Sequence, residues 1–205
     1  MKIITLTLCP AFDLHCFVKG FRPFHENSAD ITAFDAGGKG VNISRALDAG
    51  GVDNVAVVAV GAENEVAGRI RENITVHTDD APETRVSFKG FSVGADFTAA
   101  VRDRVKNYAE PGSVVTFTGR LPDGTDKAEI IALIRELAAC GIKSVIDSKS
   151  FTPDDLIEAR PWLIKPNEEE IADYAGVTAD SEESAADVAE TLRKKGIENV
   201  MISLG

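Results

Sequence analysis

Short apolar runs alternate with longer amphipathic segments along most of the chain. The apolar runs have the length of buried strands, which we predict at 3–8, 55–60, 113–118, 144–147, 162–165 and 199–203. The segments between them carry apolar residues at helical spacing and predict helices at 41–49, 97–108, 127–140, 153–159, 168–175 and 184–195. Alternating strands and helices indicate an α/β fold with a mostly parallel sheet covered on both faces. Ligands bind such folds at the carboxyl ends of the strands.

Two regions depart from this alternation, at 12–33 and 74–91. They lack a helical pattern but contain stretches of period two, for example 15–18 and 85–88. We interpret both regions as parts of a small antiparallel flap that stands off the main sheet and covers a ligand. The chain is therefore predicted to be a single α/β domain, 1–205, with lid segments at about 12–33 and 74–91.

Composition narrows the classes of function. With 205 residues, of which 44% are hydrophobic, the chain can bury a core as one domain. The net charge of -11 argues against a nucleic-acid partner, which requires a basic surface. The three cysteines lack metal-ligand or redox spacing and indicate reduced thiols. No signal peptide or membrane-spanning run is visible, so we expect a cytoplasmic protein with no membrane partner.

The run Ala-Gly-Gly-Lys-Gly-Val-Asn at 36–42 is the strongest local signal of a site. It ends a strand-like segment and opens an amphipathic helix. Such a start presents unpaired backbone N–H groups, the positive end of the helix dipole and the ammonium of Lys39, which suit an anion or a polyhydroxyl ligand. A tight turn before a helix, without any ligand, explains the same spacing.

Three further side chains near strand ends have both a chemical and a structural interpretation. Asp13 could accept hydrogen bonds from sugar hydroxyls or could cap a turn. Arg85 begins a flap strand and could be an exposed edge residue. Asp147 ends a strand, where it could act at a site or cap the following turn. The three histidines lack the spacing of metal ligands, so we assign them no chemistry.

The acidic segment 165–170 follows a predicted strand and is also ambiguous. Asn167 and Glu170, three residues apart, form a good capping box for a helix. The same carboxylates could organise Mg²⁺ and its waters beside the phosphates of a nucleotide.

Seven short motifs occur in the order found in one known family. They lie at 5–13, 37–47, 84–85, 118–124, 147–148, 165–170 and 202–205. Each motif is weakly specific, but together they resemble the ribokinase-like (phosphofructokinase-B) carbohydrate kinases over the whole chain. Within this family the chain looks most like the 1-phosphofructokinase and tagatose-6-phosphate kinase branch.

The resemblance implies a fold and a set of site residues. The fold would be a three-layer α/β/α sandwich with a mostly parallel sheet and a small β lid. The residues that would hold the sugar phosphate are Asp13, Gly37, Gly38, Lys39, Asn42 and Gly119, with Arg85 reaching the phosphate group from the lid. The residues that would lie near ATP and Mg²⁺ are Lys165, Asn167, Glu170, Ser203 and Gly205, with Glu170 acting on the metal through water.

The resemblance also implies a reaction, in which the γ-phosphoryl group of ATP moves to a hydroxyl of a phosphorylated ketohexose. Fructose 1-phosphate, giving fructose 1,6-bisphosphate, is the first candidate, and tagatose 6-phosphate is the alternative. Such chemistry requires charge neutralisation, positioning and exclusion of water more than covalent catalysis. A homodimer formed through the lid is compatible with the resemblance.

Some positions depart from the family pattern. The family's catalytic aspartate would lie beyond Gly205, so no catalytic residue is identified and weak turnover is expected. The stretch 61–84 is shorter than in the family. Arg120 stands where serine is usual, and Lys149 lies in place of a small residue. These two cations could strengthen phosphate binding, or they could lie at the rim of the site without contributing to binding.

Two other classes of function stay open from the sequence. The first is a truncated, non-catalytic domain that binds a sugar phosphate. The second is a dinucleotide-binding oxidoreductase, which ranks last because the G-x-G-x-x-G turn is absent after the first strand.

Overall fold

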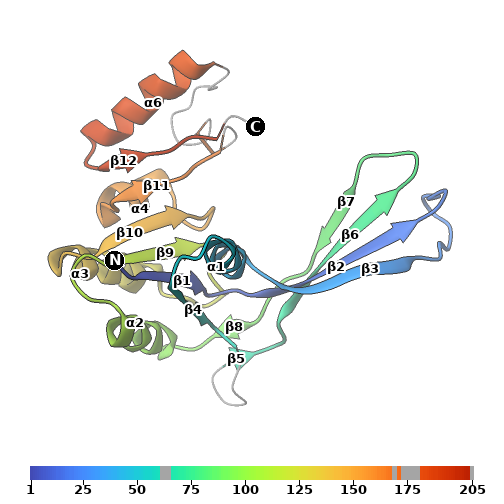
Figure 1. Cartoon of the computed structure of the whole chain (residues 1–205), viewed down its shortest axis with the longest axis horizontal. Helices are drawn as coiled ribbons and strands as arrows, with labels where there is room; N and C mark the ends of the chain where they lie inside the picture. Colours follow the sequence, from blue (N-terminus) through green and yellow to red (C-terminus); the bar gives the residue numbers. More distant parts are fainter. Residues whose placement is uncertain (61–65, 168–169, 172–180, 204–205) are drawn as a thin grey trace.

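A six-stranded parallel sheet forms the centre of the protein (Figure 1). The computed structural model describes residues 1–60, 66–167, 170–171 and 181–203. The strands follow the order β12-β11-β10-β9-β1-β4 across the sheet. Their bounds are β1 (Ile3–Thr7), β4 (Asn54–Val58), β9 (Val114–Thr118), β10 (Lys143–Asp147), β11 (Leu163–Ile164) and β12 (Asn199–Val200).

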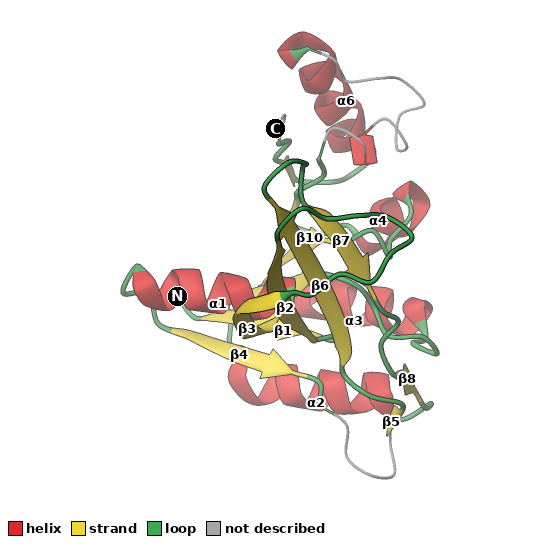
Figure 2. Ribbon diagram, turned by 90° about the vertical axis from the view of Figure 1, so that its right-hand side faces the viewer, coloured by secondary structure: helices red, strands yellow, loops and turns green. Residues whose placement is uncertain are grey.

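Helices cover both faces of this sheet, as the alternating pattern predicts. The described helices are α1 (Lys39–Ala49), α2 (Phe97–Tyr108), α3 (Lys127–Ala139), α4 (Pro153–Ala159) and α6 (Glu182–Lys194). Helix α1 packs on β1, β4 and β9, whereas α2 contacts β4 and α3 contacts β10. In Figure 2 strand β4 lies between α1 and α2, which places these two helices on opposite faces. The mixed α/β fold predicted from the sequence is therefore confirmed.

The central strands carry the core. Ile4 and Leu6 of β1 are fully buried, and Phe117 of β9 is almost fully buried. Both side-chain faces of these strands meet helices, and each buried large aliphatic side chain contributes about 1.5–3 kcal/mol. Ile130 and Ile134 of α3 pack into the same cluster. This core holds the carboxyl ends of β1 and β9 in a fixed position.

The ends of the chain's last elements differ from the predicted bounds. The strand expected at 199–203 is limited to β12, because only its first two residues pair with β11. Ser203 instead forms an isolated bridge with Asn167. Most of the helix expected at 168–175 lies outside the described residues, and the described Glu170 and Ile171 are helical.

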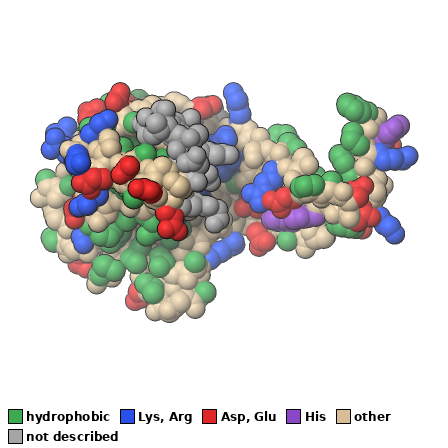
Figure 3. Space-filling view, turned by 90° about the horizontal axis from the view of Figure 1, so that it is seen from above, with side chains coloured by type: hydrophobic (Ala, Val, Ile, Leu, Met, Phe, Trp, Pro, Cys, Tyr) green, Lys and Arg blue, Asp and Glu red, His purple; other side chains and the backbone are tan. Residues whose placement is uncertain are grey.

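A second sheet of four strands projects from the body as a lid (Figures 1 and 3). It contains β2 (Ala11–Val18), β3 (Asp30–Gly37), β6 (Arg71–Thr78) and β7 (Thr84–Ser87). The expectation of a purely antiparallel flap is wrong, because β2 and β6 run parallel while β2–β3 and β6–β7 are antiparallel. Each hairpin starts at the body, so the two outgoing strands point the same way and become neighbours.

Two short strands join the lid to the body. They are β5 (Val66–Ala67) and β8 (Ser92–Val93), which pair in antiparallel fashion. Ser92 also bridges to Asp123, which follows β9. The segment after the second lid hairpin is thereby attached close to the carboxyl end of β9.

The start of α1 lies unusually close to the end of β1. A Cβ atom on Gly40 would lie 2.3 Å from Thr7 Oγ1 and 2.4 Å from the carbonyl oxygen of Leu6. Gly38, the residue before the helix, has a φ of 113°, a conformation that favours glycine. The glycines of this run are therefore required for packing, and they bring the helix start to the carboxyl edge of the sheet.

Within the described ranges, every helix is too short or too polar to pass through a lipid bilayer.

We expect Gly40→Ala to destabilise the protein by about 1–3 kcal/mol. The added Cβ atom would overlap the carbonyl group of Leu6, which cannot move aside as the end of a flexible side chain could. Urea unfolding measures this as a lower midpoint. Gly94→Ala is the matched control, because a Cβ atom there meets nothing within 4 Å. Equal midpoints for the two variants would contradict the close contact.

Candidate functional site

The carboxyl ends of β1, β9 and β10 meet the N-terminus of α1 at one edge of the sheet. Lys39, the first residue of α1, extends its ammonium to Asp147 at the end of β10, with 2.6 Å between Nζ and Oδ1. Gly119 follows β9 with a φ of 78°, and its N–H donates to the carbonyl oxygen of Asp147 over 3.0 Å. Three of the residues in the predicted motifs are thus brought together.

The N-terminus of α1 remains available for an anion. Gly38 supplies no side-chain cap, and the first turn contains no acidic residue. The first backbone N–H groups of a helix have no partner within the helix and carry partial positive charge. Asn42 lies in this first turn and is exposed. The helix start therefore has the polarity that the sequence predicts.

Asp13 lies on β2 at the base of the lid, next to the strand that leads into α1. Its Oδ1 accepts a hydrogen bond from Asn73 Nδ2 on β6 over 2.7 Å. A Cβ atom on Gly37 would come within 2.0 Å of Asp13 Oδ2. Asp13 and Gly37 are therefore adjacent, and the carboxylate is held on one side by an amide.

A cavity of about 190 Å³ opens beside Lys39 and is lined by cationic side chains. A second cavity of about 100 Å³ adjoins it, since Cys9, Arg71 and Arg120 line both. The positively charged residues around the two cavities are Lys39, Arg71, Lys89, Arg120 and Lys149. This concentration of cations is well suited to a phosphate group.

Sequence reasoning missed Arg71. It is the first residue of β6. In the parallel β2–β6 pair it lies opposite Ala11, which is two residues before Asp13 on β2. No local pattern of residues predicts this pairing of two hairpins. Arg120 and Lys149 were detectable, because both follow the carboxyl ends of predicted strands.

Two polar atoms at the cavity are buried and have no hydrogen-bond partner among the described residues. They are Arg71 Nε and Thr7 Oγ1. The Nη1 atom of Arg71 donates to Asn73 Oδ1 over 3.2 Å, so the guanidinium is held at one end only. Buried polar groups are normally paired, so these two atoms are exceptions to the usual pairing.

The thiol of Cys9 lies within the field of this cluster. Burial raises its pKa, while the guanidinium groups of Arg71 and Arg120 act in the opposite direction and Asp123 adds to the rise. The net pKa stays above the ordinary value of a thiol. Cys9 therefore lines the cavity as a neutral, protonated thiol. Its pKa responds to the charges of the two arginines.

Arg85 lies away from this cavity in the structure. It sits on β7 opposite Thr75, and its side chain is 68% exposed. Its Nη2 pairs with Glu83 Oε1 at 2.5 Å. The structure does not bring Arg85 to Lys39.

The residues predicted near the nucleotide lie together at the ends of β11 and β12. Lys165 Nζ is 3.4 Å from Ser203 Oγ. The N–H of Asn167 donates to Glu170 Oε2 over 3.0 Å, and the N–H of Glu170 donates to Asn167 Oδ1 over 2.8 Å. The capping box is thus formed. Gly205 lies outside the described residues.

Glu170 faces a cavity of about 10 Å³ that it shares with Lys165 and Ser148. This space suits one water molecule. Among the described residues no group of three His, Cys, Asp or Glu side chains has metal-ligand geometry.

The two groups of residues share one edge of the sheet. Strands β9, β10, β11 and β12 are consecutive neighbours, and adjacent strands lie about 4.8 Å apart. Asp147 at the end of β10 lies between the cationic cavity and the Lys165 group. This arrangement can hold two anionic ligands side by side.

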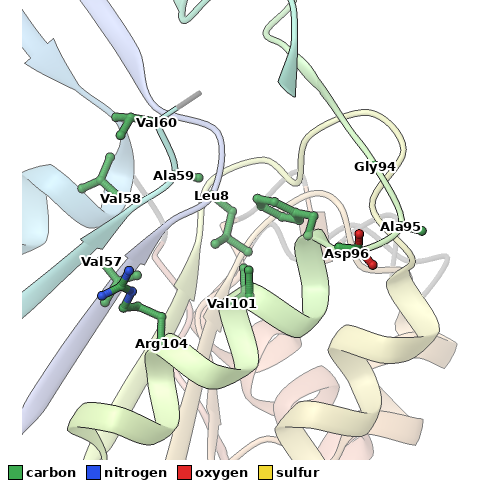
Figure 4. A pocket seen from close by; sticks show the side chains of 12 residues that line it. Leu8, Val57, Val58, Ala59, Val60, Gly94, Ala95, Asp96, Val101 and Arg104 are labelled. Atoms are coloured by element: carbon green, nitrogen blue, oxygen red, sulfur yellow. The ribbon is translucent and has the colours of Figure 1, made fainter. Parts of the chain in front are cut away.

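A different cavity of about 360 Å³ lies between β4 and α2. Figure 4 shows Val101 of α2 pointing toward Leu8, with Val57 and Val58 coming from β4. Its lining is mainly aliphatic, and its charged residues are Asp96 and Arg104.

The fold and this edge define an α/β protein with a cationic cavity at the base of a projecting β sheet. Residues 8–205 match the model of the pfkB family carbohydrate kinases, and the chain belongs to this family.

Named relatives and solved structures agree with this assignment. The chain is 28% identical to a 1-phosphofructokinase of Haemophilus influenzae, over 100% of this chain and 71% of the relative. It is 26% identical to a 1-phosphofructokinase of Bacillus subtilis, over 98% of this chain and 72% of the relative. The fold is similar to that of phosphofructokinase-2 from Escherichia coli in complex with fructose-6-phosphate. For that structure the TM-score is 0.81 and the identity 21%, over 100% of this chain and 74% of the other.

We expect Arg71→Gln to raise the pH midpoint of Cys9 alkylation, because it removes a positive charge that favours the thiolate. Peptide mapping after iodoacetamide treatment at several pH values measures the midpoint at Cys9 alone. Arg69→Gln is the control, because Arg69 is 75% exposed and pairs with Glu72. An unshifted midpoint in Arg71→Gln would show that its charge does not reach the cavity.

Proposed function

We propose that the protein transfers the γ-phosphoryl group of ATP to a hydroxyl of a phosphorylated ketohexose. Fructose 1-phosphate, which would give fructose 1,6-bisphosphate, is the first candidate, and tagatose 6-phosphate is the second. The observation that carries this proposal is the cationic cavity beside the N-terminus of α1 at the carboxyl edge of the sheet. Family membership and the names of the relatives support the same reaction.

In this proposal the acceptor lies between Asp13 and the start of α1. The carboxylate of Asp13 accepts hydrogen bonds from sugar hydroxyls, and Asn73 holds it in place. Backbone N–H groups after Gly38, together with Asn42 and Gly119, line the same side. Lys39, whose side chain is 49% exposed, would exchange its contact with the largely buried Asp147 for a contact with the substrate.

The second ligand is Mg-ATP, held near Lys165, Asn167, Glu170 and Ser203. Their lysine, amide, carboxylate and hydroxyl groups fit a magnesium-bound phosphate chain, with Glu170 acting through water. When bound, Mg²⁺ neutralises the charge of the transferring phosphoryl group. Gly205 completes the proposed set and lies outside the described residues.

No general base is assigned among the described residues. Asp13 and Asp147, the carboxylates beside the start of α1, are engaged by Asn73 and Lys39. A general base contributes about 10²–10⁴-fold to a rate. We therefore expect weak turnover from these residues by themselves, and a non-catalytic sugar-phosphate-binding domain is the alternative.

An ADP-release assay with Mg-ATP tests the proposed reaction. Fructose 1-phosphate, tagatose 6-phosphate, fructose 6-phosphate and unphosphorylated fructose are offered in parallel. We expect turnover with a phosphorylated ketose and none with fructose. Turnover with fructose alone would refute the proposal, whereas calorimetric binding of a sugar phosphate without turnover would support the non-catalytic alternative.

Lys39→Ala is expected to weaken sugar-phosphate binding about tenfold and to reduce its salt dependence, because it removes a charge-assisted contact. Isothermal titration calorimetry at two salt concentrations measures both effects. Lys106→Ala is the control, because Lys106 pairs with Glu136 on the helices far from this edge. Unchanged affinity in Lys39→Ala would contradict its proposed role.

A homodimer through the lid is part of the proposal. Ile31 and Phe34 on β3 are 70% and 60% exposed, and Val86 on β7 is 46% exposed. Figure 3 shows hydrophobic side chains on the surface of the projecting lid. Exposed apolar side chains on the edge strands of a sheet favour association with another protein surface.

We expect Ile31→Glu to shift the protein toward the monomer, since it places a charge in the apolar surface of the lid. Light scattering coupled to size-exclusion chromatography measures the molar mass. Val52→Glu is the control, because Val52 is 41% exposed just after α1. A wild-type monomer at all concentrations would refute the lid dimer.

A further inference from the structure

We propose that His15 and His77 form a binding site for a transition-metal ion that favours imidazole ligands, with zinc as its representative. The site lies in the lid sheet, apart from the cationic cavities, and it does not rest on the proposed kinase reaction. Spacing along the sequence predicted no chemistry for the histidines, but the fold brings two of them together. A metal ion held by both would clip strand β2 to strand β6.

The two rings come from neighbouring parallel strands. His15 on β2 lies opposite Thr75 of β6, and His77 lies two residues further along β6. Side chains alternate between the faces of a strand, so both histidines occupy the same face of the lid as diagonal neighbours. Asp13 and Asn73 share this face two residues nearer the body, where their side chains are hydrogen-bonded. The register of the parallel pair therefore creates the site.

The separation of the ring nitrogens suits one shared metal ion. His15 Nδ1 is 3.2 Å from His77 Nε2, and the two ring planes differ by 13°. Two nitrogens that bind one zinc ion at about 2.0–2.1 Å in tetrahedral geometry lie about 3.3 Å apart. The side chain of His77 is 42% exposed, so its ring has room to turn its lone pair toward an ion.

Glu83 orients the other side of the His77 ring. Its Oε2 lies 3.8 Å from His77 Nδ1, the ring nitrogen that does not contact His15. A carboxylate at the second nitrogen of a metal-binding histidine fixes the tautomer and raises the basicity of the ligand. Because Glu83 favours a proton on Nδ1, the Nε2 lone pair of His77 faces His15. When a metal ion binds, the proton between the rings moves to Nε2 of His15, so both facing nitrogens can coordinate the ion.

The charges around the pair are balanced. Arg85 is the cation on the neighbouring strand β7, and its Nη2 is paired with Glu83 Oε1. The carboxylate thus lies between the guanidinium and the His77 ring. This arrangement reduces the repulsion that Arg85 would exert on a bound cation.

Two imidazoles also determine the kind of metal. Imidazole nitrogens suit zinc, copper and nickel, whereas magnesium and calcium prefer oxygen ligands. Among the described residues no third His, Cys, Asp or Glu side chain completes a ligand set, so water would fill the remaining positions. Cys16 follows His15 but lies on the opposite face of β2, where its thiol contacts the carbonyl oxygen of Thr75. The site therefore differs in chemistry from the Mg-ATP site proposed above.

A metal ion here would hold together two hairpins that are distant in the sequence. The lid sheet has the strand order β3-β2-β6-β7, so the β2–β6 pairing is what joins its two hairpins. The two histidines are 62 residues apart in the chain. A ligand that binds only the paired strands stabilises that pairing by mass action. The expected effect is a lid whose inner strands open less often.

Titration of the full chain with zinc chloride by isothermal titration calorimetry tests the inference, with any histidine tag removed. We expect one zinc ion per chain, and no binding of magnesium chloride at this site. His15→Gln and His77→Gln are each expected to weaken zinc binding at least about tenfold, since losing only the hydrogen-bond partner of a ligand costs about 10–100-fold. His25→Gln is the matched control, because His25 is exposed in the loop between β2 and β3.

Hydrogen exchange measures the clip directly. At a zinc concentration about ten times Kd, exchange in 15–18 and 75–78 is expected to slow about tenfold in the wild type and to stay unchanged in the two glutamine variants. His77→Cys keeps a metal ligand and is expected to restore zinc binding, while circular dichroism shows that each variant is folded.

Three results would overturn the inference. They are a wild-type chain that binds no zinc at millimolar concentration, wild-type affinity in both His15→Gln and His77→Gln, and an equal loss in His25→Gln. Zinc binding that leaves exchange in 75–78 unchanged would overturn the clip between the strands. None of these measurements uses ADP release, so failure of the metal site and failure of the kinase reaction are distinguishable.

Discussion

The close contact between the start of α1 and the end of β1 is the constraint on which the site depends. A Cβ atom on Gly40 would overlap Thr7 and the carbonyl of Leu6, so the helix can start at this edge only because the side chain is absent. This contact places Lys39 beside Asp147, at the carboxyl ends of the central strands. The buried core under β1 and β9 keeps this edge in position.

The chain as a whole is acidic, with a net charge of -11, whereas cationic side chains line the cavities at the carboxyl edge of the sheet. The ion pair of Lys39 with Asp147 balances charge at the centre of this edge. Arg71 and Arg120 remain on one side of it, at the cavities that Cys9 also lines. Because like charges gathered in a hollow repel each other, such a cluster is most stable with an anion between its members.

The lid contributes to the cationic cavity where it meets the body. Its two outgoing strands are parallel neighbours, and this pairing brings Asn73 on β6 next to Asp13 on β2. Arg71 lies at the start of the same strand, where the lid meets the body. The lid therefore contributes at its base to the cavity, while its outer strands expose Ile31 and Phe34.

The amino-acid pattern was enough to predict the parallel sheet, its helices, and the positions of Lys39, Gly119 and Asp147 at strand or helix ends. These features follow from local periodicity and from the rule that carboxyl ends of parallel strands share an edge. The folded chain was needed to see that β2 and β6 pair in parallel, that Arg71 and Arg120 line the same cavity, and that Arg85 pairs with Glu83 away from it. Contacts between hairpins distant in sequence depend on how the hairpins leave the body, and no local pattern of residues records that geometry.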